Sequence, residues 1–200
     1  MIDDRQIGDD LKNDWEDELQ PIKHWFQAQG WEPSEFQKQS WNAYLGGASG
    51  LIQVPTGSGK TYAAVMGPIA RMLSESNSYQ GIKVLYSTPL RALSRDLTLA
   101  IEEPIQAMSW PIRVSARNSD TTSSERTKQI KNPPDILVTT PESLCVLLTT
   151  QKAIDLFSNL HTVILDEWHE LMGSKRGSQT ELALSWLRQQ NCNLQTWALS

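Results

Sequence analysis

Residues 51–61 read Leu-Ile-Gln-Val-Pro-Thr-Gly-Ser-Gly-Lys-Thr, an apolar run followed by a glycine-rich loop that ends in lysine and threonine. This pattern is typical of a phosphate-binding loop between a buried strand and a helix. The glycines let the backbone turn tightly, so that its N–H groups point at phosphate oxygens beside a helix N-terminus. We therefore expect a triphosphate to be bound by Thr56, Gly57, Ser58, Gly59, Lys60 and Thr61.

Two of these side chains have separate roles in such a loop. Lys60 is expected to place its ammonium on the β- and γ-phosphates, and the Thr61 hydroxyl to ligate magnesium. The general pattern begins with glycine, where this chain has Val54. A plain glycine–serine turn before a helix is the alternative interpretation, but the lysine–threonine ending favours the phosphate loop.

A second motif lies at residues 162–169, which read Thr-Val-Ile-Leu-Asp-Glu-Trp-His. It is an apolar strand that ends in two carboxylates. Because adjacent strand residues point to opposite faces, we expect Asp166 to hold magnesium together with Thr61, while Glu167 activates the attacking water. An acidic helix cap is the alternative for this pair, and His169 alone is equally well explained as a core or a surface histidine.

Around these motifs, short apolar runs alternate with helical stretches. The strands are expected at 51–54, 84–87, 112–115, 136–139, 163–165 and 194–199, and helices at 60–73, 89–101, 141–148 and 179–189. Two further helices are expected before them, one over 14–29 and one that begins after Ser34. Apolar strands separated by helices predict a three-layer α/β domain with a mainly parallel sheet, which binds ligands beyond the carboxyl ends of its strands.

Composition limits the remaining possibilities. Residues 1–20 hold eight acids against Arg5 and Lys12, whereas the rest of the chain has fifteen acids and sixteen bases, so one acidic arm sets the net charge of −5. Such an arm is usually solvated. No apolar run reaches the ~18 residues of a membrane span, and the start lacks a secretory signal. Cys145 and Cys192 fit no metal spacing, so we expect two reduced, packed thiols in the cytosol.

From Asp166-Glu167-Trp168-His169 onward, the chain resembles the DExH-box helicases of superfamily 2. Three segments resemble their Lhr-like group, and within it the ligase-associated DNA-damage-response helicases. These segments are Glu170 to Gly177, Trp31 to Trp41 and Pro89 to Leu97. The resemblance implies a first RecA-like P-loop NTPase domain over 21–200 that stops inside motif III and lacks the second RecA-like domain.

The resemblance also assigns roles to particular residues. His169 becomes part of the catalytic set, and Gln37 becomes the residue that reads adenine, for which a carboxamide is chemically suited. The competing role of Gln37 is a capping box with Ser34. Motifs Ia and Ib imply nucleic-acid contacts, with Arg117 as a third candidate segment. An ordinary helix start or loop is the alternative for each of these contact residues, which are Pro89, Arg91, Arg117, Thr140 and Pro141.

The function that follows is an ATP- and Mg²⁺-dependent motor on single-stranded DNA, moving 3′ to 5′ in repair. The resemblance suggests association with an ATP-dependent ligase and a nuclease, in the cytoplasm at the nucleoid. The isolated chain should hydrolyse ATP very slowly, because related NTPases take arginine fingers from a partner domain. An NTPase motor or switch that never touches nucleic acid, a non-catalytic scaffold and an RNA helicase remain alternatives.

Overall fold

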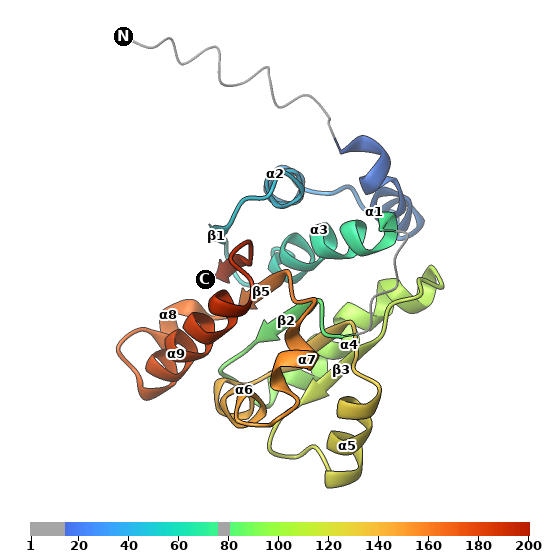
Figure 1. Cartoon of the computed structure of the whole chain (residues 1–200). Helices are drawn as coiled ribbons and strands as arrows, with labels where there is room; N and C mark the ends of the chain where they lie inside the picture. The colour runs from blue at the N-terminus through green and yellow to red at the C-terminus, as the bar shows by residue number, and fades with distance from the viewer. Residues whose placement is uncertain (1–14, 76–80) are drawn as a thin grey trace.

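A single parallel sheet organises the chain in a computed structural model that describes residues 15–75 and 81–200 (Figure 1). Its strands are β1 (Gly50–Ile52), β2 (Val84–Ser87), β3 (Val114–Arg117), β4 (Ile136–Thr139), β5 (Thr162–Leu165) and β6 (Gln195–Leu199). They lie in the order β1-β6-β5-β2-β4-β3, and every neighbouring pair is parallel. All six predicted strands are present, and the predicted parallel sheet is confirmed.

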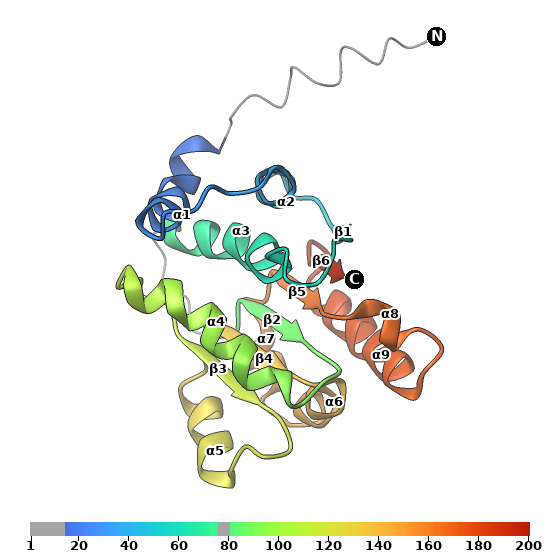
Figure 2. The ribbon, with the colours of Figure 1, turned by 180° about the vertical axis from the view of Figure 1, so that it is seen from behind.

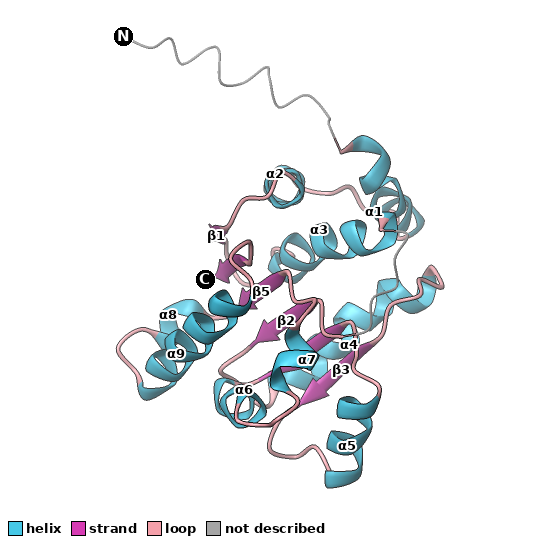
Figure 3. Ribbon diagram, viewed as in Figure 1, coloured by secondary structure: helices cyan, strands magenta, loops and turns pink. Residues whose placement is uncertain are grey.

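Helices cover both faces of this sheet, as secondary-structure colouring makes clear (Figure 3). They are α1 (Glu16–Ala28), α2 (Glu35–Leu45), α3 (Lys60–Ser74), α4 (Leu93–Ala107), α5 (Ser123–Lys131), α6 (Pro141–Leu148), α7 (Ala153–Phe157), α8 (Trp168–Leu171) and α9 (Lys175–Gln190). In Figure 1, α6 and α7 lie in front of the strands, whereas α4 lies in front in the reverse view of Figure 2. The three-layer architecture is therefore confirmed.

Alternating residues of the strands pack into two separate hydrophobic cores, one on each face of the sheet. Along β2, Val84 and Tyr86 belong to the core formed with α1–α4, whereas Leu85 belongs to the core formed with α6, α7 and α9. Successive strand residues point to opposite faces, so a strand that is apolar throughout is covered on both sides. All four residues of β2 are buried, as are those of β4 and β5.

The N-terminal helices pack on the α3 side of the sheet. Helix α1 begins at Glu16, so residues 16–20 of the expected acidic arm are helical, and Leu19 is buried in the core. Its first turn carries three acids, which interact favourably with the positive end of the helix dipole. Residues 1–14, which carry the rest of the arm, lie outside the described residues.

Several helix boundaries differ from the predicted ones. Helix α4 begins at Leu93 instead of Pro89, after a turn at 91–92. Helix α5 was not predicted; it begins after Thr122, which makes a capping box with Glu125. Helix α9 begins at Lys175, with the Ser174 hydroxyl accepting a hydrogen bond from the Gly177 amide at 3.1 Å.

Three further expectations concern composition. No described helix is long and apolar enough to cross a membrane. Both cysteines are free thiols, but only Cys145 is partly buried, so the expectation of a packed thiol is wrong for the exposed Cys192. Within residues 15–75 and 81–200, no group of three or more His, Cys, Asp or Glu side chains is arranged to hold a metal ion.

Candidate nucleotide site and nucleic-acid face

The phosphate loop joins β1 to α3 in the geometry that its glycines predict. Gly57 and Gly59 have φ angles of 81° and 91°, in the left-handed region that side chains with a Cβ avoid. Helix α3 then begins at Lys60, so its first amides face the loop. Any larger residue at 57 or 59 would strain the turn, which explains why two of the loop residues are glycine.

Gln37 connects α2 to this loop. Its Oε1 accepts a hydrogen bond from the Ser34 amide at 2.9 Å, and its Nε2 donates to the Gly59 carbonyl at 3.2 Å. The side chain is only 5% exposed. The capping interaction is therefore present, and the same carboxamide also reaches the phosphate loop. Contact with adenine stays a prediction.

The acidic pair Asp166 and Glu167 follows β5 at the carboxyl edge of the sheet. The Asp166 amide still donates to the Ser87 carbonyl at 2.8 Å, as the next residue of a parallel strand would. Glu167 instead turns into the left-handed region, with φ 46° and ψ 47°. Our expectation that strand alternation points the two carboxylates apart is therefore wrong, because the extended backbone ends before Glu167.

This turn brings Glu167 toward the phosphate loop. The distance from Lys60 Nζ to Glu167 Oε1 is 3.9 Å, although the two residues are far apart in the sequence. On the other side, His169 Nδ1 lies 3.6 Å from Glu167 Oε2 and 3.0 Å from the Ser200 hydroxyl. The loop lysine, the second acid and the histidine therefore surround one point at the carboxyl edge.

The pKa of Asp166 shows that its carboxyl interacts with Glu167 and Lys60. Burial and the neighbouring Glu167 raise the pKa of Asp166 to about 6, while Lys60 opposes the rise. Burial and then the charge of Asp166 raise the pKa of Tyr86 well above its usual value, and Thr61 opposes this rise. Thr61, Tyr86 and Asp166 must therefore lie near one another, from α3, β2 and β5.

The available atoms suit magnesium. Mg²⁺ prefers oxygen donors and takes few from the protein, because it keeps several of its waters. The Thr61 hydroxyl and the half-buried Asp166 carboxylate supply such donors, and three hydroxyls at the end of β2 are buried without partners. These belong to Tyr86, Ser87 and Thr88. Unpartnered buried hydroxyls are uncommon, and waters around an ion are one way to satisfy them.

A second set of predicted residues lies along the same edge, after β2, β3 and β4. Thr140 caps α6 by accepting a hydrogen bond from the Ser143 amide at 3.4 Å, and Pro141 is the first helical residue. Both features confirm the predicted helix start. Arg91 Nη1 donates to the Ser119 hydroxyl at 2.9 Å and lies 3.2 Å from Asp120 Oδ1, so it bridges two loops while its side chain remains exposed.

Pro89 and Arg117 differ from what the sequence suggests. Pro89 is not a first helical residue, because α4 begins at Leu93, so the expected helix start at residue 89 is wrong. Arg117 is only 6% exposed and donates to Gln129 Oε1 at 3.4 Å. With Arg126 and Ser143, it lines a cavity of about 210 Å³ between α5 and α6.

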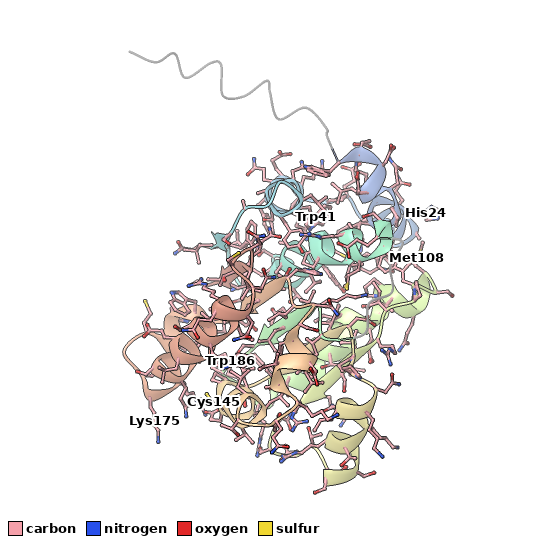
Figure 4. The ribbon with its side chains drawn as sticks, in the orientation of Figure 1. His24, Trp41, Met108, Cys145, Lys175 and Trp186 are labelled. Carbon is pink, nitrogen blue, oxygen red and sulfur yellow. The ribbon has the colours of Figure 1, made fainter. Side chains whose placement is uncertain are left out.

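Lys175 and Arg176 form a basic pair within the segment that resembles the Lhr-like group. Both residues belong to the first turn of α9, and Arg176 Nε donates to Glu142 Oε1 at 2.6 Å. This ion pair joins the start of α9 to the start of α6. Lys175 is exposed, and its side chain points outward from the domain (Figure 4).

Comparison with known proteins agrees with this geometry. The model of the DEAD/DEAH box helicase family matches residues 34–200. The chain belongs to the DEAD/DEAH box helicase family.

Similar proteins within the family are Lhr-type helicases. The chain is 34% identical over 179 residues to the Lhr helicase/uracil glycosylase of Escherichia coli K12, an alignment that covers 81% of this chain and 12% of that protein. It is 38% identical to ATP-dependent helicase Lhr-Core protein 2 of Thermococcus barophilus, covering 86% and 21%. The chain thus spans less than a quarter of these relatives.

Solved structures show the same fold. Mycobacterium smegmatis helicase Lhr, bound to ssDNA and AMP-PNP, superimposes with a TM-score of 0.83 at 34% identity, covering 92% of this chain and 25% of that one. Mss116p bound to ssRNA and AMP-PNP also gives a TM-score of 0.83, but at 18% identity. That second likeness shows the fold alone.

Membership in the helicase family places both motifs at one end of one domain, as the geometry does. The sequence interpretation missed Tyr86 and Arg126. A tyrosine inside the buried strand Val84–Ser87 was a usable signal, because a buried hydroxyl needs a partner. Arg126 gave no signal, since the sequence predicted no element at that position. Its guanidinium donates to the Asn118 carbonyl at 3.1 Å and lowers the pKa of Arg117, after the larger effect of burial.

Proposed function

We propose that this chain is the ATP-binding and hydrolysing first motor domain of a DNA helicase. The observation that carries the proposal is the meeting of Lys60 and Glu167, 3.9 Å apart, beside the half-buried Asp166 at the carboxyl edge. A cation, a metal-binding carboxylate and a second carboxylate are the groups that phosphoryl transfer to water requires. A scaffold that merely keeps the fold would have no need to keep them together.

The phosphate loop would bind the triphosphate. Amides of the loop and of the first turn of α3 would point at phosphate oxygens, and the left-handed Gly57 and Gly59 would allow that approach. Lys60 neutralises charge on the β- and γ-phosphates. Thr61 and Asp166 would hold Mg²⁺, which supplies charge neutralisation and orients the phosphates when bound.

Glu167 would orient the attacking water through its carboxylate. Its left-handed backbone aims the side chain at Lys60 instead of along the strand. His169 contacts both Glu167 and Ser200, so it limits where the carboxylate can move. Gln37 would contact adenine, and because its amide already donates to the Gly59 carbonyl, it would link the bound base to the phosphate loop.

The nucleic-acid strand would lie along the same edge, on Pro89, Arg91, Arg117, Thr140 and Pro141. Backbone amides and arginines read phosphates and not bases, so this face alone does not select DNA. Support for DNA comes from the Mycobacterium smegmatis Lhr structure with ssDNA. We infer that the motor hydrolyses Mg²⁺–ATP and moves 3′ to 5′ along the strand. We also infer that it acts at the nucleoid, in repair, together with a ligase and a nuclease.

We further propose residues 21–200 as the first RecA-like domain and residues 1–20 as an acidic arm. A second RecA-like domain would complete the motor by supplying cationic fingers, which in related NTPases raise the rate ~10³- to 10⁵-fold. The chain by itself should bind Mg²⁺–ATP, hydrolyse it very slowly and separate no duplex.

The test is an ATPase assay on the full-length protein, with single-stranded DNA, single-stranded RNA or no polymer. Stimulation by DNA supports the proposal, whereas equal stimulation by RNA favours an RNA helicase and no stimulation favours a motor that ignores nucleic acid. Lys60→Ala should weaken nucleotide binding, and Glu167→Gln should keep binding but stop turnover. Equal turnover by Glu167→Gln and wild type would remove Glu167 from the mechanism.

A further inference from the structure

Three consecutive hydroxyls at the end of β2 have no partner. The side-chain oxygens of Tyr86, Ser87 and Thr88 are all buried, and none completes a hydrogen bond. Buried polar atoms are nearly always hydrogen-bonded, so an exception calls for a missing partner such as water or an ion. Three such exceptions in succession are more than chance irregularity would explain.

The strand register decides which of these hydroxyls face the nucleotide site. Tyr86 pairs with Ile164 and Ser87 with Leu165, so the next pair in register is Thr88 beside Asp166. Tyr86 and Ile164 belong to the core on the α3 side, and two residues further along a strand the side chain returns to that face. Tyr86, Thr88 and Asp166 therefore face the phosphate loop, whereas Ser87 faces away.

The electrostatic environment agrees with this placement. Burial raises the pKa of the Tyr86 hydroxyl, and Asp166 raises it further, so the hydroxyl lies within reach of that carboxylate. The Thr61 hydroxyl lies close enough to the Tyr86 hydroxyl to oppose this rise in pKa, so the three groups lie together.

We propose that Tyr86 and Thr88 are positioning residues for the metal site: their hydroxyls bind the water ligands that Mg²⁺ retains when Asp166 and Thr61 hold it. This rests on the proposed function, because it takes Asp166 and Thr61 as the magnesium ligands. Mg²⁺ dehydrates reluctantly, so a protein site for it must satisfy coordinated waters as well as the ion. Strand β2 would then lead from the metal site directly to Pro89 and Arg91, the residues proposed to contact nucleic acid.

The experiment measures Mg²⁺ dependence instead of turnover. The complete chain is titrated with a fluorescent ATP analogue in EDTA, and then with Mg²⁺ at a fixed concentration of that analogue. Tyr86→Phe and Thr88→Val remove one hydroxyl each and keep the side-chain shape. Each should raise the Mg²⁺ concentration for half-maximal effect about 10-fold while leaving affinity in EDTA unchanged, since groups that orient metal ligands typically contribute 10- to 100-fold.

Two matched controls separate this from a structural role. Ser87→Ala removes an equally buried, unpartnered hydroxyl from the opposite face and should not move the Mg²⁺ midpoint. Tyr44→Phe makes the same chemical change as Tyr86→Phe, but the Tyr44 hydroxyl is bonded to Thr162 at 2.8 Å. Tyr44→Phe should lower the urea midpoint of the ligand-free protein without affecting Mg²⁺, whereas Tyr86→Phe should not lower it.

The outcomes are distinct. An unchanged Mg²⁺ midpoint in both Tyr86→Phe and Thr88→Val, with wild type showing Mg²⁺-dependent binding, overturns this inference and leaves the proposed function intact. A shift in Ser87→Ala equal to theirs also overturns it, because the effect would then not depend on the face. If wild type binds no nucleotide at any Mg²⁺ concentration, the proposed function itself fails.

Discussion

His161, directly before β5, should make the stability of the domain depend on pH. Its Nδ1 lies 2.7 Å from the Thr162 hydroxyl and 3.0 Å from the Tyr44 hydroxyl, and its Nε2 is buried without a partner. Burial lowers the pKa of His161 from 6.5 to about 3, and the nearby cations Arg71 and Lys83 act in the same direction. The folded protein therefore keeps this imidazole neutral.

The sign of the effect follows from proton uptake. Between its ordinary pKa of 6.5 and its folded pKa of about 3, His161 binds a proton in the unfolded chain but not in the folded one. Stability is therefore complete above the upper value and is lost as the pH falls toward the lower one. One pKa unit is worth about 1.4 kcal/mol, so for a ring that retains some exposure we expect a loss of about 1–2 kcal/mol from pH 7 to 5.

The assay is urea unfolding of the ligand-free chain at pH 7, 6 and 5, for wild type and His161→Asn. The asparagine amide can keep one hydrogen bond near Thr162 but cannot take up a proton. The variant should be less stable at pH 7, yet lose about 1–2 kcal/mol less than wild type on acidification. Parallel loss in the two proteins would refute the reasoning, because it would assign the pH dependence to other groups.

Three further predictions follow from the geometry. Gly59→Ala places a Cβ at φ 91° and 2.7 Å from Gln37 Nε2, so nucleotide affinity in the fluorescence titration should fall at least tenfold and stability by about 1–2 kcal/mol; normal affinity would contradict the loop geometry. Gly67→Ala places a Cβ 2.9 Å from the Tyr44 ring and should destabilise the domain by about 1–3 kcal/mol in urea unfolding, where a gain would show that α2 can shift. Arg91→Ala should weaken single-stranded DNA binding and reduce the salt dependence by about one phosphate contact while leaving the melting temperature unchanged; an unaltered salt slope would exclude Arg91 from the strand.

Much of the fold was predictable because its signals are local. The strand over 136–139 and the helix from Pro141 have the predicted bounds, since an apolar run, a capping threonine and a proline at the first helical position act over a few residues. The phosphate loop is equally local, as Gly57 and Gly59 adopt the conformations that their spacing predicts. Helix α5, which begins after Thr122, was not predicted.

The site was predictable as a list of residues but not as an arrangement. That Lys60 and Asp166 share one edge follows from parallel strands, because their carboxyl ends meet on one side. The direction of Glu167 did not follow, since its left-handed backbone breaks the alternation that a strand would impose. Burial of Arg117 was also hidden, because it depends on where α5 lies.

By itself, the amino-acid sequence predicted the six strands, most of the longer helices and a glycine-rich loop suited to phosphate, because hydrophobic period, glycine conformation and capping act within about one turn of chain. Only the tertiary structure decided the strand order β1-β6-β5-β2-β4-β3. That order places β2 beside β5, and so Tyr86 and Thr88 beside Asp166. The pairing of strands depends on contacts between residues that are distant in the sequence. The free energy of these contacts comes from burial across the whole sheet, so no short stretch of sequence indicates which strands pair.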